Sequence, residues 1–241
     1  MPQPERGFTI MELMIATSIF LVICAAMFGL LQLSQQKYSS ETQLSGAFQE
    51  TRLAIDQIVR DFNVSGYPSQ SIYSKLPSDT TQYAQNPVAW SPNYPGTPCS
   101  VGSPVGAPCT TPSDFDLILE TDLGSGVSWI RYQLKGTTLY RAVAPKVAGT
   151  TPDAATSDPA VMVPFLTNVM NSPPAQPIFK FTCDTPTGPQ PCAAAGNYGV
   201  ANNIRDVDIT LIVMTRLRDM QTQQLKLVEL NGRGHRVNPA N

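Results

Sequence analysis

An uninterrupted apolar segment near the start of the chain constrains the fold more than any other feature. The 26 residues from Phe8 to Leu33 contain one charged residue, Glu12, and no further charge occurs before Lys37. As a helix the segment would be about 39 Å long at ~1.5 Å per residue, enough to cross a hydrocarbon core of ~30 Å. A cleaved secretory signal usually has a shorter apolar region of roughly 7–15 residues and a small-residue exit. We therefore predict a transmembrane helix.

The same helix is predicted to continue beyond the membrane. No proline occurs between Phe8 and Tyr67. Beyond the apolar segment, large apolar residues recur at helical spacing, at Leu44, Phe48, Ile55, Val59 and Phe62. The tetrapeptide SGYP at residues 65–68 has the composition of a helix stop. One helix from Phe8 to about Phe62 would be about 82 Å long, with its amphipathic part packed against the remainder of the chain.

The five cysteines divide into two kinds. Cys24 lies within the apolar segment and is interpreted as a small apolar residue. The other four form two close pairs among Pro, Gly, Ser and Thr residues: Cys99 with Cys109, and Cys183 with Cys192. Zinc sites favour tighter spacing and often histidine, whereas the only histidine here is His235. Disulfides in an oxidising compartment are therefore predicted, and of the three possible connectivities we choose the local one.

The part of the chain after the helix is predicted to be rich in strands and loops. Most of the 22 prolines lie between residues 68 and 191, which favours loops there. Alternating apolar residues predict strands at 114–122, 127–135, 137–143, 204–218 and 224–238. The first three are expected to form an antiparallel meander around the turn LGSG, and the last to close the sheet. The predicted fold class is α+β, a long helix carrying an antiparallel sheet with disulfide-containing loops.

The N-terminal pattern resembles that of type IV prepilins. A short leader with a basic residue is followed by Gly7, Phe8 and Thr9, and Glu12 stands five residues after the glycine. The resemblance implies a type IV pilin-like fold. It also implies that a membrane peptidase cuts between Gly7 and Phe8 and methylates Phe8. The implied organisation is a leader peptide at 1–7, a transmembrane half of the helix at 8–33, an amphipathic half at 34–65, and a head at 66–241.

The acid in the apolar segment has two interpretations. A carboxylate costs up to ~3 kcal/mol at the bilayer centre on insertion scales, and less near the end of a span, where Glu12 lies. The resemblance implies that Glu12 pairs with the N-terminal amine of a neighbouring subunit, which would offset the desolvation of both groups. Alternatively, Glu12 reaches the interface in an ordinary single-pass anchor.

The amphipathic half resembles that of PilW-like minor pilins, with Arg60–Asp61 and Gly66–Tyr67 in the matching places. Minor pseudopilins of type II secretion, the J class especially, share parts of this pattern. The resemblance implies a structural minor pilin that primes pilus assembly or forms the tip complex. Its partners would be other pilin and minor pilin subunits and the prepilin peptidase. The chain would reside in the inner membrane with its head in the periplasm, and later in the extracellular pilus.

The alternatives to a structural pilin or pseudopilin are a pilus-displayed adhesin or DNA-uptake module and, more remotely, an enzyme on a membrane anchor. No catalytic arrangement and no cofactor is predicted, and His235 is interpreted as a surface residue on a terminal strand. Four acids, Asp114, Asp116, Glu120 and Asp122, could bind calcium. They lack the usual loop pattern of a calcium site. We therefore interpret them as acids at the solvent face and at the ends of a strand.

Two further groups of residues bear on possible partners. Four arginines, Arg216, Arg218, Arg233 and Arg236, could form a small basic patch for DNA. The net charge of −2 and the pI of about 5.4 instead favour a solvated strand face and no nucleic-acid partner. Trp90 and Tyr94, in the stretch 89–113, could form an adhesive tip or a contact to another minor pilin. The preferred interpretation of that stretch is a surface loop closed by a disulfide.

Overall fold

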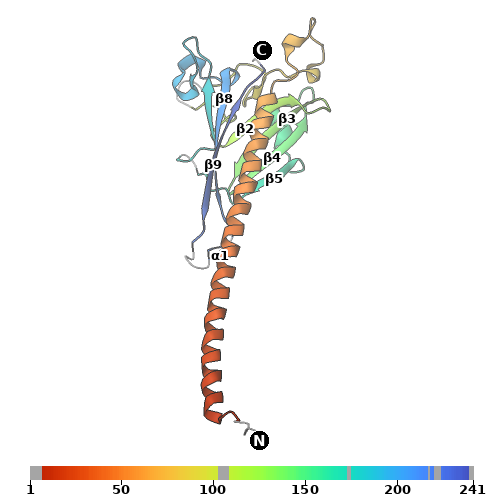
Figure 1. Cartoon of the computed structure of the whole chain (residues 1–241). Coiled ribbons are helices and arrows are strands. Elements are labelled where there is room, and N and C mark those ends of the chain that lie inside the picture. Colours follow the sequence, from red (N-terminus) through yellow and green to blue (C-terminus); the bar gives the residue numbers. More distant parts are fainter. Residues whose placement is uncertain (1–6, 103–108, 173–174, 217, 220–223, 239–241) are drawn as a thin grey trace.

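A single helix, α1 (Ile10–Val64), dominates the computed structural model, which describes residues 7–102, 109–172, 175–216, 218–219 and 224–238 (Figure 1). The predicted continuous helix is thus confirmed, displaced by two residues at each end. At its C-terminus the N–H of Ser65 donates to the Phe62 carbonyl at 3.2 Å. Gly66 then adopts φ +81°, a left-handed conformation that glycine takes at little cost, and the helix stops.

The buried face of α1 lies in its last turns. Its buried residues are Thr51, Ala54, Ile55, Ile58, Asp61 and Phe62. They recur at intervals of three and four, so they form one face of the helix. Ile58 and Phe62 are fully buried, whereas the apolar half is exposed along its whole length. The molecule is therefore a compact head on a long protruding helix (Figure 1).

The head contains two antiparallel sheets. The first has the order β1-β2-β3-β4-β5, with β1 (Val88–Ala89), β2 (Asp116–Asp122), β3 (Val127–Lys135), β4 (Thr138–Pro145) and β5 (Met162–Thr167). The second has the order β7-β6-β8-β9, with β6 (Phe179–Cys183), β7 (Gln190–Pro191), β8 (Ile204–Met214) and β9 (Leu227–His235). The short helix α2 (Pro152–Thr156) and five 3₁₀ turns lie in the connections: η1 (Gln70–Ile72), η2 (Thr80–Gln82), η3 (Cys192–Ala194), η4 (Gly196–Tyr198) and η5 (Ala201–Asn203).

The expected meander of β2, β3 and β4 is confirmed, with Leu119 opposite Ile130 and Ile130 opposite Val143. The expectation of one sheet closed by the last strand is wrong, because β8 and β9 belong to the second sheet. The two sheets join where the chain leaves β5: the Met170 N–H donates to the Ile212 carbonyl at 2.7 Å.

The side chain of Asn171 extends this junction between the sheets. Its Oδ1 accepts from the Ile212 N–H at 2.9 Å, and its Nδ2 donates to the Thr210 carbonyl at 2.9 Å. Asn171 is 4% exposed. A side-chain amide here satisfies backbone groups of β8 that would otherwise be buried without a partner.

Strand β9 runs alongside α1 in the same direction (Figure 1). Near the start of β9, Lys226 Nζ donates to Ser40 Oγ at 2.8 Å, and at its end the His235 N–H donates to Asn63 Oδ1 at 2.9 Å. Between these points Gly232 and Gly234 face the helix. A Cβ at Gly232 would lie 2.2 Å from Ile55 Cγ2, so the sequence NGRGH lets the helix approach the strand closely.

Candidate functional site

The start of α1 is held by a capping box between Thr9 and Glu12. The Glu12 N–H donates to Thr9 Oγ1 at 3.3 Å. In return Glu12 Oε2 accepts from both the Thr9 N–H and Thr9 Oγ1 at 3.1 Å. Two otherwise unpaired N–H groups of the first turn are thereby satisfied. The sequence analysis missed this role, although the T-x-x-E spacing in front of an apolar run is its signature.

Gly7 and Phe8 precede the helix and are exposed. The Phe8 side chain is 86% exposed, and a Cβ at Gly7 would meet no other atom within 4 Å. Packing among the residues that the structure describes therefore gives no reason for a glycine at position 7. The peptide bond between Gly7 and Phe8 is accessible from outside the chain.

The apolar half of α1 has no partner within the described residues. Its most apolar 18-residue window is not buried at all, and the helix is long and apolar enough to cross a membrane by length and composition. The few polar groups in it are satisfied locally, since Thr17 Oγ1 donates to the Leu13 carbonyl at 2.9 Å and Ser18 Oγ to the Met14 carbonyl at 2.7 Å. Such internal satisfaction is what a helix in hydrocarbon requires.

Residues 3–28 match the family model described as the prokaryotic N-terminal methylation motif. The chain is type IV pilin-like. Comparisons with curated proteins and with solved structures found no match. The motif and the exposed apolar helix together indicate membrane anchoring, and in general terms interaction with other pilins and with a prepilin peptidase.

In this pilin-like chain a buried ion pair ties the helix to the first sheet. Asp61 Oδ2 accepts from Arg141 Nη2 at 2.9 Å and from the Tyr132 hydroxyl at 2.6 Å. Gln57 Nε2 donates to the other carboxylate oxygen at 2.7 Å. Burial, reinforced by the Asp61 charge, raises the pKa of Tyr132, so its hydroxyl remains a neutral donor. Of the pair Arg60–Asp61, only Asp61 is buried.

A second buried network joins β2 to the loops beyond the helix. Glu120 is fully buried and accepts from Lys146 Nζ at 2.5 Å and from the Tyr94 hydroxyl. Lys146 Nζ also donates to the Tyr83 carbonyl at 3.0 Å. Burial and then the neighbouring Glu120 charge raise the pKa of Tyr94 well above its usual range. These contacts hold the segment containing residues 83 and 94 against the sheet.

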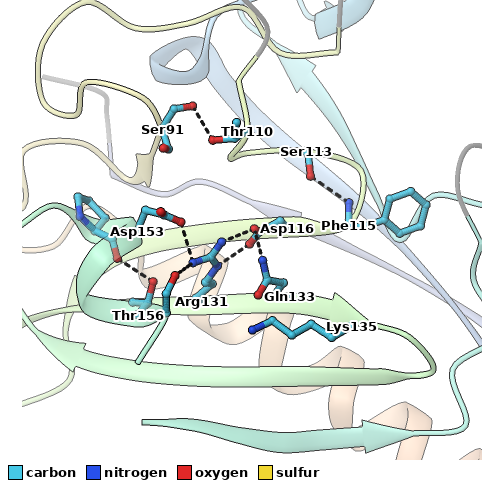
Figure 2. Close-up of polar contacts among 12 residues, drawn as sticks. Ser91, Thr110, Ser113, Phe115, Asp116, Arg131, Gln133, Lys135, Asp153 and Thr156 are labelled. Carbon is cyan, nitrogen blue, oxygen red and sulfur yellow. Dashed lines mark hydrogen bonds and ion pairs between the residues drawn. The ribbon is translucent and has the colours of Figure 1, made fainter. Parts of the chain in front are cut away.

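A third network surrounds Arg131 on β3, as Figure 2 shows. Its Nε and Nη2 donate to the two oxygens of Asp116 at 2.8 and 2.5 Å, and its Nη1 lies 2.8 Å from Asp153 Oδ1. Gln133 Nε2 donates to Asp116 Oδ2 at 2.8 Å. Burial raises the pKa of Asp116 despite these donors, which act in the opposite direction. The bidentate pair links β3 to β2, and the contact of Arg131 with Asp153 links β3 to α2.

The structure gives three of the four acids that could have bound calcium different partners. Asp116 pairs with Arg131, Glu120 pairs with Lys146, and Asp122 Oδ1 accepts from the N–H groups of Gly124 and Gly126 in the turn after β2. Among the described residues no group of three or more His, Cys, Asp or Glu side chains could hold a metal ion. The preferred interpretation of solvent-facing acids is also wrong for Asp116 and Glu120, because β2 is buried on both faces.

Three of the four arginines considered for DNA binding pair with separate acids. Arg216 lies 3.6 Å from Glu50, Arg233 2.9 Å from Asp206, and Arg236 3.7 Å from Asp184. Each of these three arginines therefore has an acidic side chain beside it. The predicted surface position of His235 fits β9, where its Nδ1 lies 2.5 Å from Asp206 Oδ1 and its side chain is 55% exposed.

The aromatic residues considered for an adhesive tip lie inside the head. Trp90 and Tyr94 are 3% and 7% exposed and contact each other edge to face, with ring centroids 4.7 Å apart. Neither an exposed aromatic tip nor a plain surface loop describes them. The structure has the disulfides Cys99–Cys109 and Cys183–Cys192. Residues 103–108 of the same stretch lie outside the described residues.

The loop closed by the first disulfide lies beside the segment that follows the second disulfide. The Val101 N–H donates to the Gly199 carbonyl at 2.8 Å, and the Ala201 N–H donates to the Cys99 carbonyl at 3.1 Å. Cys192 is 4% exposed. Both disulfides are therefore part of the packed head.

Proposed function

We propose that the chain is a structural minor pilin of a type IV pilus that helps to prime assembly or forms part of the tip complex. The observation that carries the proposal is a methylation motif over residues 3–28 on an apolar helix whose surface is left uncovered by the described head. Lipid or the helices of other subunits can cover the apolar surface of such a helix. Structural subunits, rather than enzymes, carry this motif.

The proposed organisation is a leader at 1–7, a transmembrane half at 8–33, an amphipathic half at 34–65 and a periplasmic head at 66–241. The peptidase would cut the exposed bond after Gly7 and methylate Phe8. Glu12 would then pair with the N-terminal amine of a neighbouring subunit. In the uncut chain the same carboxylate accepts from Thr9, so it is stabilised before assembly and can exchange this local bond for a charge pair.

The first test is the processing of the chain in its native host. Mass spectrometry should find a chain that begins at methylated Phe8. Gly7→Leu should leave the leader attached, because a bulky side chain would block approach of the peptidase to the backbone. Gly29→Leu, also free of contacts within 4 Å, is the matched control and should be cut normally. An assembled chain with its leader intact would exclude the pilin proposal.

The second test separates the two possible tasks of Glu12. Thr9→Val removes only the hydroxyl part of the capping box, at a cost of about 1 kcal/mol to the helix start. Glu12→Ala removes the cap and the proposed intersubunit charge. Both variants should be cut and remain in the inner membrane, but only Glu12→Ala should be lost from sheared pili and from complexes with other minor pilins. Wild-type recovery of Glu12→Ala in both preparations would show that the charge has no role in assembly.

A third test, deletion of the gene, distinguishes a pilus from a secretion system. Loss of the gene should reduce surface pili and leave protein secretion unchanged. A defect confined to secretion would assign the chain to the minor pseudopilins of type II secretion instead.

A further inference from the structure

A polar hollow lies where the segment between β8 and β9 meets α1. It is lined by Gln36, Lys37, Ser40, Glu41, Asp219 and Lys226 and has a volume of about 200 Å³. We call it the junction pocket. Ser40 Oγ donates to Asp219 Oδ2 at 2.9 Å and accepts from Lys226 Nζ at 2.8 Å, and Lys226 Nζ lies 3.0 Å from Asp219 Oδ2. The head thus reaches along the helix and contacts it well below the buried face.

The walls of the junction pocket carry charges of both signs. Lys37 and Lys226 are cations, and Glu41 and Asp219 are acids. Lys226 is engaged by Ser40 and Asp219, but an ammonium group has three donors. Lys37 and Glu41 are exposed and make no hydrogen bond or ion pair with any other residue that the structure describes. Lys37 and Glu41 can therefore each bind a charged group of a ligand, in addition to the interacting residues Ser40, Asp219 and Lys226.

The level of the pocket along the helix limits what this ligand can be. Residues 36 to 41 lie about 5–12 Å beyond Leu33, the last residue of the apolar half, at ~1.5 Å per residue. The headgroup layer on each side of a bilayer is roughly 5–7 Å thick. Tyr38, at the same level, is 75% exposed, and aromatic side chains with a polar end are enriched at membrane interfaces. The lower edge of the pocket, at Gln36 and Lys37, would therefore lie at the outer boundary of the headgroup layer, within reach of lipid headgroups.

We propose that the junction pocket binds the headgroup of a zwitterionic phospholipid that carries a phosphate and a primary ammonium group. This inference depends on the membrane-spanning state under the proposed function. The phosphate is held between Lys37 and Lys226, and the ammonium donates to the Glu41 carboxylate, with charge-assisted bonds at both ends. At about 200 Å³ the pocket is smaller than the ~300–1,000 Å³ typical of sites for drug-sized ligands, which suits a headgroup.

The charge pattern distinguishes this ligand from its relatives. Free phosphate or an anionic glycerol headgroup leaves Glu41 without a cation and places a negative charge near two acids. A choline headgroup has no N–H to donate. Binding of an ethanolamine-type headgroup fixes the rotation of the head above the bilayer, and the lipid is released when the subunit leaves the membrane.

The test uses the full chain in nanodiscs with equal amounts of ethanolamine, glycerol and choline phospholipids of identical acyl chains. Native mass spectrometry after mild detergent release counts the lipids that remain bound. The ethanolamine lipid should be enriched. The double variant Lys37→Gln, Lys226→Gln should lower its retention roughly thirtyfold, since each lysine near an anionic headgroup contributes about 1 kcal/mol. Lys75→Gln with Lys180→Gln, two exposed lysines elsewhere on the head, is the control and should leave retention unchanged.

Glu41→Gln tests the acid separately, and it should shift the preference from the ethanolamine to the glycerol lipid. Equal retention of all three lipids by the wild type, or no loss in the double lysine variant, would overturn the inference. Displacement of the bound lipid by inorganic phosphate would also overturn it, because the site would then bind simple anions. Alkaline extraction of membranes tests insertion independently: a chain that is extracted refutes the proposed function, whereas an inserted chain without lipid preference refutes only the junction pocket as a lipid site.

Discussion

Three buried carboxylates each connect separate parts of the molecule. They are Asp61 on α1 and Asp116 and Glu120 on β2, and each pairs with a cation, Arg141, Arg131 or Lys146 respectively. Each carboxylate also accepts from a neutral donor, a tyrosine or a glutamine. Removing one member of such a pair leaves a buried charge without compensation, which typically costs ~3–5 kcal/mol. These residues therefore specify how the helix, the first sheet and the loops fit together.

Asp61→Asn should destabilise the head by about 3 kcal/mol, at the low end of that range because Arg141 is 22% exposed. The asparagine keeps the size of the side chain but removes the charge that Arg141 and Tyr132 contact. Thermal unfolding of the full chain in detergent measures the loss. Asp56→Asn, on the exposed face of the same helix and 3.9 Å from Arg52, should change stability by less than about 0.5 kcal/mol. Equal effects of the two variants would contradict the role of Asp61.

Asp206 should make the head sensitive to acid. Its burial tends to raise the pKa, but hydrogen bonds from His235 and Arg233 outweigh this and lower the pKa below its usual value. A carboxylate whose pKa is lower in the folded state than in the unfolded state stabilises the fold. This stabilisation is complete at pH values above the unfolded-state pKa of ~3.9, and it is lost as the pH falls through the folded-state pKa. Asp206→Asn should therefore be less stable than the wild type at pH ~7, and the difference should shrink below pH ~4.

Melting temperatures of Asp206→Asn and the wild type from pH ~7 to ~3 would check that their stability difference shrinks as the pH falls. Asp208→Asn, two residues along β8 and more exposed, is the control and should shift stability only slightly. A difference between Asp206→Asn and the wild type that grows as pH falls below ~4 would contradict the lowered pKa.

The partners of these residues could not be read from the sequence. The run DFDLILETD alternates like a strand with one solvent face, so Asp116 and Glu120 were expected at that face. Both faces of β2 are covered in the structure. Which cation meets each acid depends on contacts between residues that lie 15 to 80 positions apart. Local patterns carry no information about such pairs, whereas the capping box at Thr9 and Glu12 was recognisable because it is local.

At the scale of elements, the fit of α1 against β9 depends on Gly232. Gly232→Ala would place a Cβ 2.2 Å from Ile55 Cγ2, so the helix must move away from the strand, with an expected loss of about 1–3 kcal/mol. Adding Ile55→Ala should recover part of the loss, because the second change removes the obstructing methyl group. Unfolding of the two single variants and the double variant forms a cycle that measures this coupling.

Gly46→Ala is the matched control on the same helix. A Cβ there meets nothing within 4 Å, and alanine is a better helix former, so this variant should be unchanged or up to ~1 kcal/mol more stable. Absence of coupling between positions 55 and 232 would contradict the close approach.

Elements with strong local signals were predictable, and elements defined by distant pairing were not. The helix followed from its apolar pattern and the absence of proline, and the β2–β3 hairpin from alternation around a turn. Strand β6 was missed because its neighbours β8 and β7 are chosen by long-range contacts rather than by the five residues Phe179–Cys183. The division into two sheets is likewise a consequence of pairing across the chain.

At the scale of the whole molecule, two disulfides each close a short loop in the head. Each disulfide should stabilise the head by roughly 2–3 kcal/mol on the chain-entropy model. Peptide mapping under non-reducing conditions should find Cys99 linked to Cys109 and Cys183 linked to Cys192. Because the first loop contacts the segment that follows the second disulfide, replacing both pairs by alanine should cost less than the sum of the separate replacements, since either replacement alone already weakens these shared contacts. Free thiols or a crossed linkage in the mapped peptides would refute the local pairing.

The side-by-side course of α1 and β9 has a mechanical consequence. If the chain is a pilus subunit, as proposed, tension on the filament would pull it along the axis of α1. From Ser40 to Asn63 the strand accompanies the helix for about 34 Å at ~1.5 Å per residue. The row of contacts between α1 and β9 follows the direction of the force. The contacts are therefore loaded in shear and must break together, rather than one after another. The unfolding rate under force, which governs such rupture, would then be low, and the head would transmit traction without extending.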